Sequence, residues 1–209
     1  MLIYIAGIPG VGKTTVIKSL VEKLNSTGNK ALSIRGLPIL CKLAGDISPE
    51  EFRKLPDSIR EQYRPEMFKI IYEEDLNDPK TTRILDGHFA YYEAEGKEYS
   101  TRPIQKGDYT QMKAIFVITA SSENIMERRK KDNQERTDRT LDLEHIIEQG
   151  KIENDEALKQ ASELNIPLVF SSNNSTIDNT VHEIYFELEK LKLFQNEIKH
   201  PSAIEIKLR

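Results

Sequence analysis

The sequence lacks tryptophan and has a single cysteine, Cys41, among 209 residues. One cysteine excludes an internal disulfide and any zinc site built from several cysteines, which suits a reducing cytosol. No apolar run approaches the roughly 18 residues needed to cross a membrane. The short apolar start also lacks a basic leader and a small-residue cleavage site. We therefore expect a cytoplasmic protein that does not associate with membranes.

An excess of positive charge is also missing. The 30 lysines and arginines are outnumbered by 34 aspartates and glutamates, so the net charge is −4 and bulk nucleic-acid binding is not expected. Any nucleotide site must therefore concentrate its positive charge locally. No repeat or linker divides the chain, and we expect residues 1–209 to form a single domain, with an oligomer possible.

One motif organises the rest of the chain. The stretch 7–15, GIPGVGKTT, fits the phosphate-binding P-loop pattern at every specified position and lies between an apolar strand, 2–6, and an amphipathic helix, 15–24. Its glycines let the backbone aim several N–H groups at one point beside a helix N-terminus, where a polyanion binds. The residues predicted to hold ATP are Gly7, Pro9, Gly10, Val11, Gly12, Lys13, Thr14 and Thr15.

Four more segments have the apolar, β-branched character of strands: 31–35, 82–88, 114–119 and 167–170. The order strand, helix, strand over the first 35 residues is typical of the crossover unit of a parallel sheet. Segment 89–104, rich in tyrosine and glutamate, is compatible with a hairpin at the sheet edge. Segment 143–164 has the period of one long helix, or of two helices that meet near Gly150.

Residues 37–78 form a helical insertion between the second and third strands. The capping-box pattern of Ser48-Pro49-Glu50-Glu51 predicts a short helix through Leu55, and a longer helix to about Leu76 is expected after Pro56. In a phosphotransferase such a segment can close over the acceptor, with Arg53 as a candidate contact. An ordinary solvated helix face remains the alternative.

Two further stretches point to a nucleotide site. Asp86 and His88 end the third strand on the sheet edge that also carries the P-loop, so Asp86 is placed to reach a Mg²⁺ ion and His88 to contact the substrate. A concentration of cations spans 128–139 and precedes a polar break, which suits a small lid over 128–141. Asn173, after the last strand, is a candidate contact for adenine.

These segments resemble a known family. The P-loop, Phe52-Arg53-Lys54-Leu55-Pro56, Leu85-Asp86-Gly87-His88 and the run from Arg128 through Arg136 and Arg139 are similar to the archaeal type of adenylate kinase, and to nucleoside monophosphate kinases generally. The resemblance covers most of the chain to about Leu191. It implies a P-loop NTPase fold with three α/β/α layers, a five-stranded parallel sheet, an acceptor-binding insertion and an arginine-bearing lid. It also implies phosphoryl transfer from ATP to a nucleoside monophosphate.

The roles follow from charge, because an acceptor phosphate is already anionic and needs no general base. Lys13 is assigned to the β- and γ-phosphates, and Thr14 and Asp86 to Mg²⁺. The transferring group is assigned to Arg128, Arg136 and Arg139. The arginine that common adenylate kinases place just after Asp-Gly-Phe-Pro is missing here, and Arg102 is the candidate to replace it. No role is assigned to the tail, 195–209.

Two alternatives remain open on the sequence alone. A kinase for another small acceptor, such as a sugar or a nucleic-acid 5′ end, would keep the P-loop and change only the insertion and lid contacts. An ATP-driven switch or assembly factor would hydrolyse ATP slowly and use no acceptor. The preferred acceptor therefore has to be found by experiment.

Overall fold

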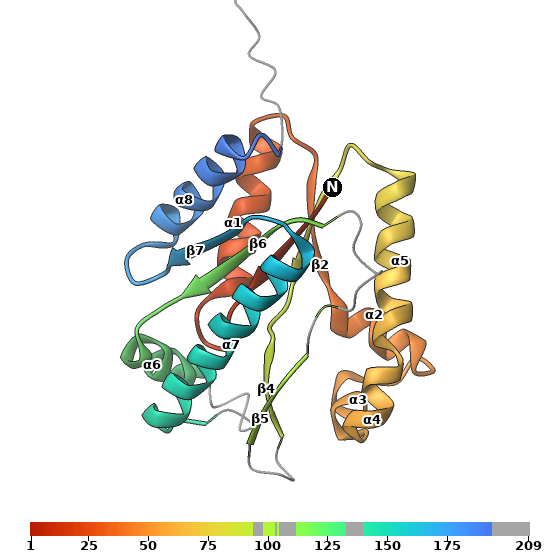
Figure 1. Cartoon of the computed structure of the whole chain (residues 1–209), viewed down its shortest axis with the longest axis vertical. Helices are drawn as coiled ribbons and strands as arrows, with labels where there is room; N and C mark the ends of the chain where they lie inside the picture. Colours follow the sequence, from red (N-terminus) through yellow and green to blue (C-terminus); the bar gives the residue numbers. More distant parts are fainter. Residues whose placement is uncertain (94–97, 103, 105–111, 133–139, 194–209) are drawn as a thin grey trace, which may run out of the picture.

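The computed structural model describes residues 1–93, 98–102, 104, 112–132 and 140–193 (Figure 1). Its centre is a five-stranded sheet in the order β2-β3-β1-β6-β7, and every neighbouring pair is parallel. All five strands therefore end at one edge. The predicted fold class is confirmed. The strands are β1 (Leu2–Ala6), β2 (Ala31–Arg35), β3 (Thr82–Asp86), β6 (Met112–Thr119) and β7 (Leu168–Ser172).

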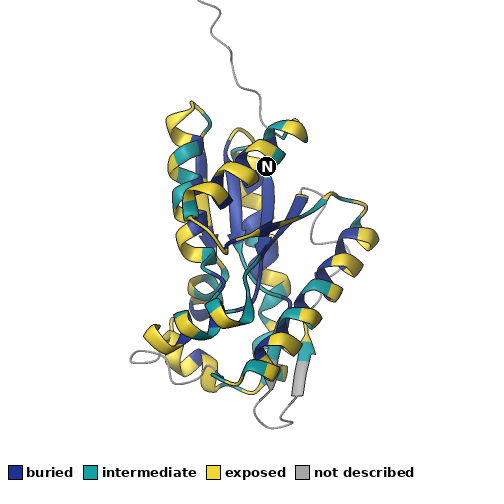
Figure 2. Cartoon of the chain, turned by 90° about the vertical axis from the view of Figure 1, so that its left-hand side faces the viewer, coloured by how far each residue is buried: buried dark blue, intermediate teal, exposed yellow. Residues whose placement is uncertain are grey.

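Helices cover both faces of this sheet (Figure 1), and its three central strands, β3, β1 and β6, are almost wholly buried, whereas the edge strands β2 and β7 are partly exposed (Figure 2). Alternate side chains of β1 enter two separate cores, with Ile3 and Ile5 in one and Leu2 and Tyr4 in the other. Helices α1 and α8 close the first core, and α5 and α7 close the second. Their bounds are α1 (Lys13–Ser26), α5 (Arg64–Asn77), α7 (Leu143–Leu164) and α8 (Ile177–Lys190). No helix in the described part of the chain is long and apolar enough to span a membrane.

The insertion between β2 and β3 consists of α2 (Gly36–Leu43), α3 (Pro49–Lys54), α4 (Asp57–Gln62) and α5. The predicted capping box is present at the start of α3, where Ser48 Oγ accepts from Glu51 N at 3.2 Å and Glu51 Oε2 accepts from Ser48 N at 2.8 Å. The longer helix expected after Pro56 is present as α5, which ends at Asn77, but it begins later than predicted because the separate helix α4 precedes it. Pro65 has no N–H to continue the hydrogen-bond ladder, so α4 stops and α5 starts with this proline in its first turn.

The predicted hairpin is confirmed as β4 (Ala90–Glu93) and β5 (Glu98–Thr101), an antiparallel pair that packs against α7. Segment 143–164 is one continuous helix that passes through Gly150. Helix α6 (Ser122–Asp132) leads into the predicted lid. Residues 133–139 of that lid, with Arg136 and Arg139, and the tail 195–209 lie outside the described residues.

Candidate active site

The P-loop leaves β1 and enters α1 through glycines in the left-handed region. Gly7, Gly10 and Gly12 have φ values of 140°, 96° and 94°. Gly12 is the N-cap of α1, and a Cβ atom there would lie 2.5 Å from Asn173 Nδ2. Both the backbone angle and the space therefore require glycine at this position.

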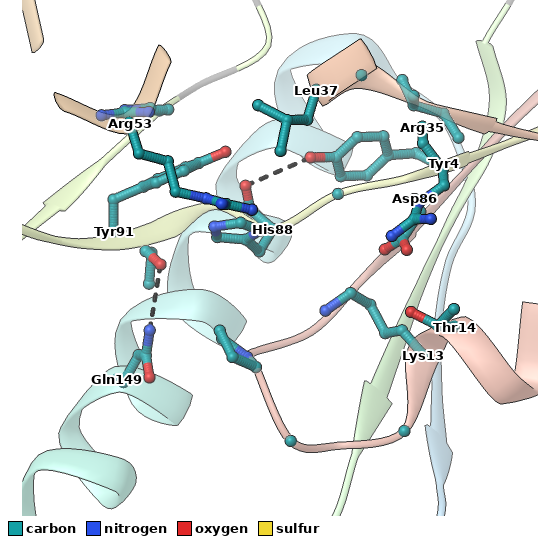
Figure 3. Close-up of a pocket in the computed structure, with 18 of the residues that line it drawn as sticks. Tyr4, Lys13, Thr14, Arg35, Leu37, Arg53, Asp86, His88, Tyr91 and Gln149 are labelled. Atoms are coloured by element: carbon teal, nitrogen blue, oxygen red, sulfur yellow. Dashed lines mark hydrogen bonds between the residues drawn. The ribbon is translucent and has the colours of Figure 1, made fainter. Parts of the chain in front are cut away.

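A cavity of about 1460 Å³ opens beside the P-loop (Figure 3). It runs along the carboxyl edge of the sheet, between the insertion on one side and the hairpin and α7 on the other. Of the predicted ATP contacts in the P-loop, six line it directly: Pro9, Gly10, Gly12, Lys13, Thr14 and Thr15. The other two P-loop residues, Gly7 and Val11, instead line a second cavity of about 350 Å³.

The cavity is strongly cationic in a chain of net charge −4. Its described lining carries eight cationic side chains and three carboxylates, Glu61, Asp86 and Asp132. Positive charge at the sheet edge is thus concentrated as a polyanion site requires. The cations are Lys13, Arg35, Arg53, Arg60, Arg64, Arg102, Arg128 and Arg129.

Lys13, Thr14 and Asp86 face one space (Figure 3). The Lys13 ammonium donates to the Gly7 carbonyl, so it folds back over its own loop. Thr14 is exposed at the start of α1, and Asp86 ends β3 next to β1. A hydroxyl and a carboxylate fit Mg²⁺, which keeps several waters and takes few protein ligands. Among the described residues, no cluster of three or more His, Cys, Asp or Glu forms an all-protein metal site.

Arg128 and Asn173 are both used to hold the P-loop. Arg128 donates to Val11 O at 2.9 Å and to Asn173 O at 2.8 Å, and Asn173 Nδ2 donates to Val11 O at 2.7 Å. Asn173 is 3% exposed. Both residues line the cavity, but their polar groups point to protein partners here. Contact of Asn173 with adenine and of Arg128 with the transferring phosphate stay predictions.

Arg129 lies within the cation run 128–139 and has no assigned role in the site predicted from the sequence. It is 1% exposed, and its guanidinium donates to Pro9 O at 2.9 Å, Thr140 O at 3.1 Å and Gln149 Oε1 at 2.8 Å. It lies four residues after Ile125, which is buried in the core, so the two share a helix face. That spacing is the sequence signal that identifies the inward-facing arginine.

Arg102 lies in a cluster of charges on the far side of the cavity. Its guanidinium is 2.5 Å from Asp57 Oδ1 and 2.9 Å from Glu61 Oε1, and it stacks over the Tyr91 ring at 3.8 Å. The same two carboxylates of α4 pair with Arg60 and Arg64. Arg102, which directly follows β5, therefore joins the hairpin to helix α4 beside the cavity.

His88 and Arg53 both line the cavity between these two sides. The His88 ring packs against Tyr91 with centroids 4.1 Å apart. Burial, followed by the charges of Lys13, Arg102 and Arg64, lowers the pKa of His88 from its usual 6.5 to about 3. His88 is thus a neutral hydrogen-bonding group at physiological pH. Arg53 is exposed on α3, and substrate contact of either residue stays a prediction.

A buried polar stripe on α7 was missed by the sequence reasoning. Gln149, Glu153 and Gln160 are 6%, 1% and 1% exposed, whereas the apolar Ile147 and Leu158 of the same helix are 54% and 53% exposed. Glu153 accepts from the backbone of the P-loop and of the β3–β4 connection, and Gln160 accepts from Ile104 N. On the buried face of α7, polar side chains that form hydrogen bonds therefore occupy positions where an amphipathic helix normally has apolar side chains.

Comparison with known proteins adds the family. A family profile described as an AAA domain matches residues 6–147. The chain belongs to this AAA-domain family. The AAA domain found here spans the P-loop, the insertion, the hairpin and the start of α7. No curated protein matches the sequence.

Solved structures of shikimate kinases are similar in fold to most of this chain, including the AAA domain. That of Aquifex aeolicus is 19% identical, with a TM-score of 0.56 over 93% of this chain and 100% of that one. That of Bacteroides thetaiotaomicron is 15% identical, with a TM-score of 0.59 and coverage of 90% and 98%. That of Acinetobacter baumannii, in complex with shikimate, is 17% identical, with a TM-score of 0.53 and coverage of 92% and 95%. The P-loop kinase fold is thereby confirmed, and the resemblance to adenylate kinases stays a prediction.

Proposed function

We propose that the protein is an ATP-dependent phosphotransferase of the nucleoside monophosphate kinase type, transferring the γ-phosphoryl group of ATP to AMP or a related monophosphate. The observation that carries this proposal is the cavity of about 1460 Å³ beside the P-loop, which has cations at both of its ends. Pockets for one ligand commonly have about 300 to 1,000 Å³. The cavity thus has room for a donor at the P-loop and an acceptor at the insertion.

On the donor side, the P-loop backbone and Lys13 bind the phosphates, and α1 adds the positive end of its dipole. Thr14 and Asp86 are the residues that would hold Mg²⁺, which when bound neutralises charge on the β- and γ-phosphates. Lys13 must leave the Gly7 carbonyl to reach a phosphate, and that carbonyl keeps it close by until then.

On the acceptor side, two arginines are exposed and three are paired. Within the described part of the chain, Arg35 and Arg53 are exposed and have no ion pair. Arg60, Arg64 and Arg102 pair with Asp57 and Glu61. A phosphate monoester carries a charge close to −2, so it competes with these carboxylates for the arginines. The His88 ring, which packs against Tyr91 and lines the cavity, supplies an aromatic group on which a base can stack.

A second candidate is a kinase that phosphorylates the hydroxyl group of a small carboxylic acid. The placement of Asp86 favours it, because a carboxylate at the sheet edge beside Lys13 can accept the proton that a hydroxyl acceptor must lose. The acceptor-side arginines can bind a carboxylate as well as a phosphate. One of the similar shikimate kinase structures holds shikimate, which is an acceptor of this kind.

A panel of acceptors distinguishes these proposals. Mg-ATP is incubated with AMP, dAMP, CMP, UMP, GMP, dTMP or shikimate, and ADP and the phosphorylated acceptor are measured. Lys13→Ala is the blank. Lys18→Ala removes an exposed lysine of α1 outside the cavity lining and is the matched control.

We expect one monophosphate to be phosphorylated well above the rate of ATP hydrolysis alone, with Lys18→Ala active and Lys13→Ala inactive. Transfer to shikimate but to no monophosphate would support the second candidate and refute the first. If ATP binds and every acceptor is inert, the kinase proposal fails, and a switch that hydrolyses ATP for a macromolecular partner becomes the better explanation.

A further inference from the structure

Glu153 of α7 joins the P-loop to the connection between β3 and β4. Its Oε1 accepts from Gly7 N at 2.8 Å, at the start of the P-loop. Its Oε2 accepts from Phe89 N and Ala90 N, both at 2.7 Å, in the connection that carries His88. Glu153 is 1% exposed. One buried carboxylate therefore holds two loops that are more than 80 residues apart in the sequence.

The contacts are those of the ionised carboxylate, because all three described partners are N–H donors and a protonated oxygen would also need an acceptor. Burial raises the pKa of Glu153, and the Lys13 charge and the three N–H bonds only partly oppose this shift. The ionised form is thus the costly one in the folded chain.

Each loop held by Glu153 continues directly into a candidate substrate contact. The carbonyl of Gly7 accepts from the ammonium of Lys13, and Phe89 and Ala90 lie between His88 and Tyr91. We propose that Glu153 is a positioning residue. It fixes the P-loop relative to residues 87–90, which follow β3 and are called the acceptor loop below, so that the donor and acceptor phosphates meet in line. This inference rests on the proposed phosphoryl transfer, but it can be tested by nucleotide binding alone.

Glu153→Gln should disturb the two loops unequally. A glutamine has one oxygen that can accept from these N–H groups, and its NH₂ group takes the place of the other carboxylate oxygen. The better orientation directs the oxygen to Phe89 N and Ala90 N, which leaves the NH₂ group against Gly7 N. The acceptor loop then keeps its two hydrogen bonds, and the P-loop loses its one.

We expect Glu153→Gln to weaken ADP binding, measured by titration calorimetry with Mg²⁺, by about 10-fold, the effect of one unsatisfied buried N–H group. Removal of a negative charge below the P-loop would by itself favour a phosphate. A loss of affinity therefore reports loop geometry rather than charge. The matched control is Glu156→Gln, the same change at a buried position of the same helix, whose partners are Gln160 and Lys159.

The proposal is supported if Glu153→Gln alone loses ADP affinity while the two variants have similar melting temperatures. Unchanged or tighter binding of ADP to Glu153→Gln refutes it, as does an equal loss in both variants. If the wild-type chain binds ADP but transfers phosphate to no acceptor, the proposed function fails, and the calorimetric result still decides the role of Glu153.

A measurement on the wild-type chain covers the case in which the variant does not fold. In NMR spectra, the amide proton signals of Gly7, Phe89 and Ala90 should share one titration step as acid protonates Glu153, because one carboxylate binds all three. A separate step at about pH 3 in the Phe89 signal belongs to the neighbouring His88 and is removed by repeating the titration on His88→Gln. A Gly7 signal that moves at a different pH from the other two would overturn the proposed connection.

Discussion

The buried guanidinium of Arg129 provides the sharpest test of how the site is held together. Three of its hydrogen bonds reach Pro9 in the P-loop, Thr140 in the segment before α7, and Gln149 in α7 itself. Arg129→Met keeps most of the aliphatic stem, which lies against Gly10, but leaves these three acceptors unpaired. We therefore expect the variant to lose the hydrogen bonds by which Arg129 connects α6 to the P-loop and to α7.

The size of the effect follows from the contacts. A hydrogen bond to a charged group contributes about 1.5 to 3 kcal/mol. Three such bonds are partly offset by the cost of burying the guanidinium, so we expect a net loss of about 3 kcal/mol in the free energy of unfolding. For a domain of this size, 1 kcal/mol corresponds to roughly 2–4 °C. The melting temperature should then fall by about 6–12 °C.

Far-UV circular dichroism is the assay of choice, because the chain has no tryptophan to report unfolding by fluorescence. The neighbours in sequence are the controls. Arg128→Met removes a partly exposed guanidinium and should change stability far less while impairing phosphoryl transfer. Lys130→Met alters an exposed position and should stay within about 0.5 kcal/mol. Equal melting of Arg128→Met and Arg129→Met, or a shift under about 2 °C for Arg129→Met, would refute the assignment.

Two further predictions concern the loop after β3 and the helix beside it. His88 has a pKa of about 3 in the folded chain and about 6.5 when unfolded, so the unfolded state binds more protons and stability falls as the pH is lowered from 6.5 toward 3. His88→Gln should reduce this fall, and urea midpoints at several pH values will measure it; equal pH slopes for both proteins would contradict the assignment. Gly87→Ala should lower the free energy of unfolding by about 1 to 3 kcal/mol, because the added Cβ would lie 2.2 Å from Tyr4 Oη. Gly150→Ala should instead stabilise α7 by about 0.5–1 kcal/mol, because its added Cβ would have its closest contact at 3.9 Å. Thermal melting of both variants tests the pair, and similar melting would contradict the reading of Gly87.

The fold could be predicted because its signals are local. The five strands are short apolar segments next to clear turns, and the P-loop marks the first crossover without ambiguity. The exception is the helix expected after Pro56. Its apolar period continues through 57–76, so periodicity alone gives no sign of a break, and only the missing N–H of Pro65 does.

The site could be predicted only where a motif fixes the backbone. Lys13, Thr14 and Asp86 follow from the P-loop and from the strand end beside it. Glu153 could not be found in this way, because a glutamate within an amphipathic helix is normally assigned to the solvent side. Its burial depends on three backbone N–H groups from distant parts of the chain, and no local pattern records where those groups lie.

The same reasoning explains how an acidic chain maintains a cationic cavity. Eight cations at one edge would repel one another, and the structure relieves this by giving many of them protein oxygens as partners. Arg128 and Arg129 are held by fixed carbonyl and amide oxygens, so these two cations reinforce the P-loop. The pairs that Asp57 makes with Arg60 and Arg102 join charged side chains that are only partly buried, so an incoming dianion can compete for them. On the proposed function, the acceptor end is therefore the end of the cavity that is suited to rearrange when substrate binds, whereas Arg128 and Arg129 already hold the P-loop at the donor end and Lys13 has to leave the Gly7 carbonyl.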